Sequence, residues 1–183
     1  MSVLVAVGVV GRIAFGQLAL ASPTPVYGIL IKVGLTETLA FVSGFVFGSG
    51  LGFLTGGLII VISDFFMIPG AWTPFIAAII GIFGVSGGAI RRLAANPSAL
   101  MLGVSAAFLT VVSEFLQNAW FAWFFNMPIL AALAMAIPSM ATAAANNVVL
   151  FTAVAPRIIR LVQEATRRPS GLGAQRTNSS QQL

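Results

Sequence analysis

Seven polar and aromatic side chains have types and positions that suit holding a small molecule inside an otherwise apolar chain. The first, Glu114, lies in a long apolar stretch and shares a helical face with Asn118, four residues later. An acid inside a membrane segment is costly to bury, so it indicates a functional group by default. The structural alternative is that Glu114 neutralises Arg12, and the two roles are compatible.

Asp64, Trp72 and Thr73 surround a loop with the sequence Pro-Gly-Ala-Trp-Thr-Pro-Phe, residues 69–75. Its proline and glycine interrupt helical geometry between two apolar segments. Irregular backbone at membrane depth persists only where protein or a water-filled cavity satisfies it, which makes the loop a candidate ligand site. Alternatively, Trp72 and Thr73 are an interfacial anchor and a helix cap. Asp64 can bind ligand, pair with Lys32 or face external water.

Trp120 and Asn147 complete the candidate set. Trp120 and Trp123, with the phenylalanines around them, can stack on a planar ring or form an aromatic belt at the membrane boundary. Asn147 and its neighbour Asn146 can contact a ligand or bridge two helices through amide hydrogen bonds. Both interpretations stay open for each residue.

The residue types also exclude much chemistry. The chain has no cysteine and no histidine, which removes thiolate and imidazole metal sites, thiol catalysis and serine-histidine relays. Four acidic residues are too scattered to hold magnesium and a pyrophosphate, and the single lysine does not belong to a phosphate-binding loop. We therefore expect no enzyme activity, no metal and no cofactor. If the chain takes part in ATP-driven transport, another chain must bind the ATP.

Composition places these residues in a membrane. Of 183 residues, 58% are hydrophobic and 7% are charged, and the mean hydropathy is +1.03. Such a chain has room for about six spans with short loops. The net charge of +5 comes from basic residues beside apolar spans, which indicates a lipid bilayer as partner and not nucleic acid.

Apolar runs and helix breakers predict an all-α bundle of six transmembrane helices in residues 1–168 and a disordered polar tail in residues 169–183. The sixth span is predicted to begin at Pro138, after an apolar segment on the outer face, and to continue past Pro156 as a basic helix. The alternative is one long helix kinked at Pro138. The predicted spans are residues 2–21, 36–47 (or 26–47), 51–68, 73–90, 98–125 and 138 onward.

Local signals add detail to these spans. Thr36 and Glu37 look like a helix start, Gly48 opens a tight turn, and Ser98 caps the fifth span. Small residues in the first span suit close packing. Arg12, near the middle of that span, should find a carboxylate, first Glu114 and otherwise Asp64, with snorkelling to the surface as the alternative.

Arginines set the expected orientation. Arg91, Arg92 and the arginines after the sixth span lie on one side, the cytoplasmic side by the positive-inside rule, so both termini are expected in the cytoplasm. The connection that ends at Gly34, the Trp72 loop and the Asn126 turn then lie outside. A ligand is predicted on the outer side, between Trp72 and Thr73 and the outer halves of the fifth and sixth spans.

Several of these stretches resemble a known family. They are the glycine-rich segment Gly48 to Gly57, Ser63-Asp64-Phe65-Phe66, the loop at residues 69–75, and Asn147 to Pro156 with the basic residues after it. Over about residues 8 to 162 the chain resembles the substrate-binding S components of energy-coupling factor transporters.

That resemblance implies six helices, a vitamin-sized ligand, a membrane T component, two ATP-binding-cassette ATPases and a place in a prokaryotic plasma membrane. It also implies that the S component topples in the membrane to carry its ligand inward. Two positions depart from the family pattern: only Ser2 and Ala6 have the small-residue spacing used for docking, and Ala143 stands where similar sequences have histidine.

Two other functions fit the residues. One is a stand-alone proton-coupled or ion-coupled carrier with Asp64 and Glu114 as proton sites. The other is a membrane assembly subunit that uses its small residues only for packing. For an S component, the ligand ranks as cobalamin-like by analogy, and a smaller heterocycle fits equally well.

Overall fold

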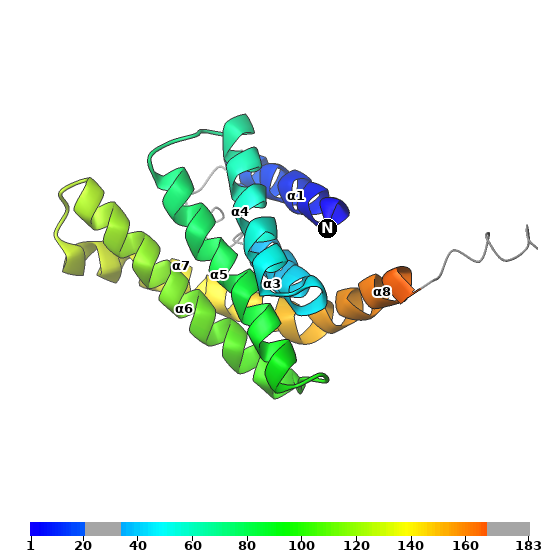
Figure 1. Ribbon diagram of the computed structural model, residues 1–183. Helices are drawn as coiled ribbons and strands as arrows, with labels where there is room; N and C mark the ends of the chain where they lie inside the picture. Colours follow the sequence, from blue (N-terminus) through cyan, green and yellow to red (C-terminus); the bar gives the residue numbers. More distant parts are fainter. Residues whose placement is uncertain (21–33, 168–183) are drawn as a thin grey trace, which may run out of the picture.

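The computed structural model describes residues 1–20 and 34–167, and every regular element in those ranges is a helix (Figure 1). The connection before Gly34, with Tyr27 and Lys32, and the tail predicted to be disordered lie outside the described residues. Because α7, η1 and α8 follow one another without a break, the described chain forms six helical rods. The elements are α1 (Ser2–Leu20), α3 (Leu35–Phe47), α4 (Ser49–Phe66), α5 (Trp72–Leu93), α6 (Ala99–Phe124), α7 (Ile129–Val149), the π-helix η1 (Leu150–Val154) and α8 (Ala155–Arg167).

Four rods are long and apolar enough to cross a membrane: α4, α5, α6 and the continuous helix Ile129–Ala165. The apolar stretch of α1, Ser2–Gly16, is shorter, and α3 has 13 residues. At 1.5 Å per residue α3 is about 20 Å long, which is less than the roughly 30 Å of a hydrocarbon core. The predicted all-helical fold is confirmed, and four of the six predicted spans have the length and apolarity of membrane helices.

The predicted limits of the third, fourth and fifth spans agree with α4, α5 and α6 to within three residues. Ser98 caps α6 as predicted, because its Oγ accepts a hydrogen bond from the Met101 N–H at 3.2 Å. The turn between α3 and α4 is made by Gly48 alone, whose φ of 101° is a left-handed conformation that favours glycine.

One predicted helix cap and one predicted helix start are wrong, although α3 begins at Leu35, one residue from its predicted start. Thr36 does not cap α3: the cap position is Gly34, and the hydroxyl of Thr38 donates to the Gly34 carbonyl at 2.8 Å. Pro138 does not begin a helix but lies inside α7, which runs unbroken from Ile129. The alternative of one long helix through Pro138 is therefore the observed arrangement. Proline is tolerated inside membrane helices where neighbouring groups satisfy the freed backbone.

Three glycines let α3, α4 and α5 meet at backbone contact. A Cβ atom at Gly44 would overlap the Gly84 carbonyl, and one at Gly84 would overlap the backbone of Gly52. Across the same contact the hydroxyls of Ser43 and Thr55 share a hydrogen bond of 2.7 Å. Small residues at helix contacts allow this close approach in membranes, and they make the three helices the central unit of the fold.

The first helix packs on this unit through small residues, as predicted. A Cβ at Gly8 would overlap the side chain of Ile59 in α4, and one at Gly11 would overlap Leu35 in α3. The contacts of α1 among the described elements are with α3 and α4. This choice of neighbours decides which charged groups Arg12 can reach.

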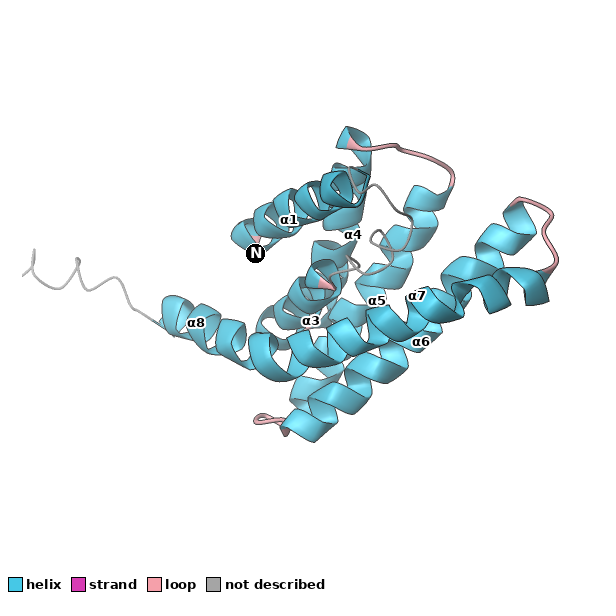
Figure 2. Ribbon diagram, turned by 180° about the vertical axis from the view of Figure 1, so that it is seen from behind, coloured by secondary structure: helices cyan, strands magenta, loops and turns pink. Residues whose placement is uncertain are grey.

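Helices α6 and α7 form an antiparallel hairpin whose turn, at Asn126, projects to one side of the molecule in both ribbon views (Figures 1 and 2). The hairpin contacts α5 little and joins the central unit mainly through η1 and α8. Phe151 of η1 is fully buried, with its ring centroid 4.7 Å from that of Phe41 and 6.4 Å from that of Phe83. This contact positions the polar face of the hairpin toward α3.

Candidate ligand-binding site

Arg12 is paired, and its partner is Asp64. The Arg12 guanidinium donates to Asp64 Oδ1 and to the hydroxyl of Ser63, and the Asp64 side chain is 4% exposed. The first choice of partner, Glu114, is wrong, because α1 packs on α3 and α4 and makes no contact with α6 in the described chain. The second choice, Asp64, is confirmed.

The other carboxylate oxygen of Asp64 holds the loop before α5. Thr73 donates its hydroxyl to Asp64 Oδ2 at 2.7 Å, and the Gly70 N–H donates to Thr73 Oγ1 at 3.2 Å. The network joins α1, the end of α4, the loop and the first turn of α5. Asp64 and Thr73 are thus brought together as predicted, and each is hydrogen-bonded within the protein, with both Asp64 oxygens taking part.

Trp72 and Trp120 lie in one aromatic cluster between the start of α5 and the end of α6. Trp72 stacks on Phe121 with ring centroids 6.4 Å apart, and Trp120 stacks on Phe75 at 5.3 Å and on Phe124 at 4.9 Å. These stacks link two helices that otherwise touch little. The rings proposed to hold a ligand are therefore stacked on the protein's own aromatic side chains.

Glu114 and Asn147 lie on the facing surfaces of the α6–α7 hairpin, and both are buried. Asn147 Nδ2 donates to Thr110 Oγ1 at 2.8 Å, and Thr110 precedes Glu114 by one turn of α6. Asn118, one turn later, is half-buried, and its Nδ2 donates to the Glu114 backbone carbonyl at 2.7 Å. Three of the seven predicted residues thus belong to a polar strip inside the hairpin.

Asn147 Oδ1 stands out in this strip. The residue is 1% exposed, and this oxygen has no hydrogen-bond partner in the part of the chain that the structure describes. It lies against Gly34, where an added Cβ would overlap it, at the N-terminus of α3. The first hydrogen bond of α3 runs from the Thr38 N–H to the Gly34 carbonyl at 3.0 Å, so the N–H groups of the three residues between Gly34 and Thr38 precede it. Asn147 Oδ1, a hydrogen-bond acceptor, and the N–H donors at the start of α3 therefore lie close together inside the protein.

Sequence reasoning missed Gly34, Ser63 and Thr110. Thr110 was detectable, because it lies four residues before Glu114 on the same helical face. Ser63 precedes Asp64 directly and had no signal of its own. Gly34 was assigned to a connection, and only the packing of α3 against α7 reveals that it borders the polar strip.

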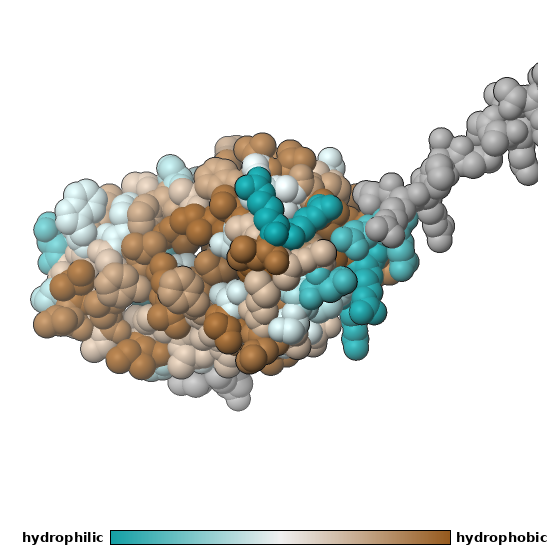
Figure 3. Space-filling view, turned by 60° about the horizontal axis from the view of Figure 1, so that its bottom comes forward, coloured by the Kyte–Doolittle hydropathy of each residue, from teal (hydrophilic) through white to brown (hydrophobic). Residues whose placement is uncertain are grey.

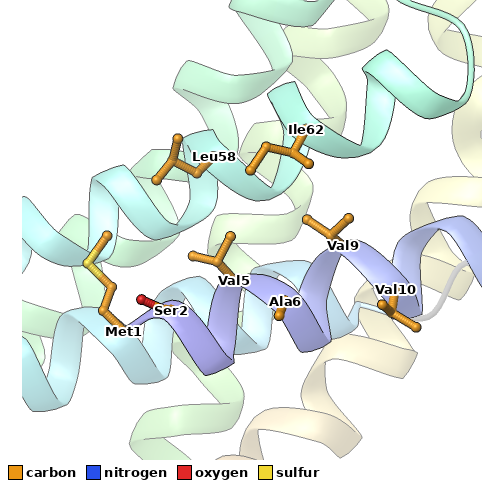
Figure 4. Close-up of a pocket in the computed structure, with 8 residues that line it drawn as sticks. All are labelled: Met1, Ser2, Val5, Ala6, Val9, Val10, Leu58 and Ile62. Carbon is orange, nitrogen blue, oxygen red and sulfur yellow. The ribbon is translucent and has the colours of Figure 1, made fainter.

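A separate apolar groove of about 420 Å³ lies between α1 and α4 (Figure 4). Its lining residues come from the first ten residues of the chain and from Leu58 and Ile62, and they include Ser2 and Ala6. None of the seven predicted site residues lines it. The groove is therefore distinct from the polar strip.

Comparison of the chain with protein-family models, curated proteins and solved structures gave no match. The resemblance to energy-coupling factor S components stays a prediction that depends on the residues named above.

Proposed function

We propose that the chain is the substrate-capture S component of an ATP-driven importer of the energy-coupling factor type. In this proposal it crosses a prokaryotic plasma membrane six times, keeps both termini in the cytoplasm, and takes up a vitamin or vitamin precursor from outside. A membrane T component and two ATP-binding-cassette ATPases supply the energy.

The observation that carries the proposal is the buried Oδ1 of Asn147, which has no hydrogen-bond partner among the described residues. A buried polar atom without a partner costs about 1–3 kcal/mol, and folded proteins keep few of them. A ligand that donates an N–H or O–H to this oxygen would remove the cost. Thr110 and Glu114 extend the polar surface next to it, and the N-terminal N–H groups of α3 suit an acceptor on the same ligand. A heterocycle with adjacent donor and acceptor groups would hydrogen-bond to both.

The aromatic cluster has a supporting role in the proposal. Trp72 and Trp120 each stack on a neighbouring protein ring, so they hold the start of α5 against the end of α6. Ligand orientation then depends mainly on Asn147 and Glu114.

The ion-coupled carrier is less well supported, because it needs Asp64 to exchange protons during transport. Both Asp64 oxygens are engaged, one by Arg12 and one by Thr73. Releasing a proton-binding carboxylate from these partners would break the junction of α1, α4 and α5.

Affinity purification of the tagged chain from its native membrane, followed by transport assays, tests the proposal. We expect a T component and two ATPases to co-purify, and we expect the chain alone in lipid vesicles to show no concentrative uptake. Rapid uptake by the chain alone under a pH gradient would instead support the ion-coupled carrier. Purification without ATPases and without a bound small molecule would support the assembly subunit.

A further inference from the structure

Four arginines, Arg91, Arg92, Arg157 and Arg160, are exposed where α5 ends and α8 begins. The guanidinium of Arg91 donates to two carbonyl oxygens at the end of α3, one of them Phe45 at 3.0 Å, which satisfies the negative end of that helix. The other three arginines, Arg92, Arg157 and Arg160, extend the positive charge over the surface. Teal side chains gather toward the α8 end of the face in Figure 3.

One hydrophobic cluster joins the helices that carry these arginines. Ile90, which precedes Arg91, packs in that cluster with Phe45 of α3 and with Ile159 of α8. Arg91 holds the end of α5 to the end of α3, and α3 also contacts α8, so α3 connects the two pairs of arginines. We call Arg91, Arg92, Arg157 and Arg160 the arginine surface.

Helix α8 is amphipathic in a way that directs its charges outward. Ile158, Ile159 and Val162 pack against the hydrophobic clusters of the bundle, whereas Arg157 and Arg160 are exposed. A helix whose apolar face is already used for packing keeps its basic face available to a partner.

We propose that the arginine surface binds the headgroups of anionic phospholipids. The exposed leucines beside the arginines favour a lipid over a soluble anion: Leu93, next to Arg92, is 80% exposed, and Leu161, next to Arg160, is 65% exposed. Arginine beside an exposed apolar side chain matches the boundary between headgroups and acyl chains, where one contacts phosphate and the other contacts hydrocarbon. Inorganic phosphate or a nucleic acid in water has no hydrocarbon that the leucines could contact. The inference is independent of the transported ligand, because it needs only the bilayer.

The test compares lipid preference in variants of the full-length chain. The protein is placed in nanodiscs of equal phosphatidylglycerol and phosphatidylcholine with matched acyl chains, and native mass spectrometry counts the lipids that remain bound. Each arginine near an anionic surface contributes about fivefold in affinity. We therefore expect phosphatidylglycerol to be enriched on the wild type, and the enrichment to fall about 25-fold in the Arg157→Gln/Arg160→Gln double variant, which removes two such contributions.

Three controls keep the result interpretable. The Arg157→Lys/Arg160→Lys variant keeps the positive charge and should keep the enrichment. A loss in the glutamine variant alone then results from the lost charge and not from misfolding. Glu164→Gln removes the acid on the same exposed face and should raise it. Millimolar inorganic phosphate or glycerol phosphate should not displace the lipid. Equal retention of both lipids by the wild type, unchanged enrichment in the double glutamine variant, or displacement by a soluble anion would overturn the proposal.

Discussion

Replacing Asp64 with leucine, with Arg12 left in place, is predicted to destabilise the protein more than replacing both. In the structure the Asp64 side chain is 4% exposed and that of Arg12 is 25% exposed, so the single variant leaves a mostly buried arginine without its carboxylate. It also removes the acceptor of the Thr73 hydroxyl. The double leucine variant contains no unpaired arginine, so it loses only the acceptor of the Thr73 hydroxyl.

The magnitudes follow from these contacts. Breaking a buried ion pair by removing one partner costs about 3–5 kcal/mol. Because a quarter of the Arg12 side chain reaches the surface, we expect the lower end, about 3 kcal/mol, for Asp64→Leu. Arg12→Leu should cost about 2 kcal/mol, since Asp64 keeps its bond from Thr73. The double variant should lose about 2 kcal/mol, which gives a coupling of about 3 kcal/mol.

Reversible unfolding in mixed micelles, followed by circular dichroism, measures the four free energies of the double-mutant cycle. The matched control is Arg12→Leu combined with Glu114→Leu, which should be additive within about 0.5 kcal/mol because α1 and α6 do not touch in the described chain. A coupling below about 0.5 kcal/mol for Arg12 and Asp64 would refute the ion pair. A larger coupling between Arg12 and Glu114 would instead support Glu114 as the partner of Arg12, which was the first prediction from the sequence.

Three further predictions concern stability. Gly84→Ala should destabilise the bundle by about 2 kcal/mol or more, because the new Cβ would meet backbone, whereas Gly50→Ala has open space and should cost little in the same unfolding assay. Arg91→Gln should cost about 1–2 kcal/mol through loss of charged hydrogen bonds to the α3 carbonyls, and an unchanged unfolding midpoint would contradict that role. Trp120→Ala should lower the thermal midpoint clearly, while Trp123→Ala, at a position 75% exposed, should barely change it, and equal effects would argue against the aromatic cluster as a structural link.

Apolar runs separated by strong breakers allowed α4, α5 and α6 to be located from the sequence alone. Pro69, Gly70 and Pro97 interrupt hydrophobic stretches of membrane length, so few alternative boundaries exist. Pro138 was harder to interpret, because proline both begins helices and is tolerated inside membrane helices. Only the packing of the hairpin decides between these outcomes.

The partner of Arg12 could not be predicted from charge alone. Asp64 and Glu114 both lie in apolar helices, and the cost of a lone charge favours pairing with either. The choice depends on which helices α1 contacts, and that depends on glycines whose partners lie more than 20 residues away in the chain, such as Gly8 against Ile59.

The candidate site was predicted in part. Glu114, Asn118 and Asn147 were identified because polar residues are rare in apolar helices, and the structure places them in one hairpin. The importance of Asn147 Oδ1 depends on Gly34, which has no side chain and hence no chemical signal in the sequence. Its position at a helix start next to α7 is a property of the fold.

The most direct test of the proposed ligand site is mass spectrometry of the small molecule that purifies with the chain. We predict one bound vitamin-like molecule per chain, with occupancy reduced about threefold to tenfold in Asn147→Ala, as expected for one hydrogen bond. Ser139→Ala, also in α7, removes a hydroxyl that donates to the Ala136 carbonyl and should leave occupancy unchanged. Absence of any bound small molecule from the wild type, or equal occupancy in the wild type and Asn147→Ala, would contradict the account.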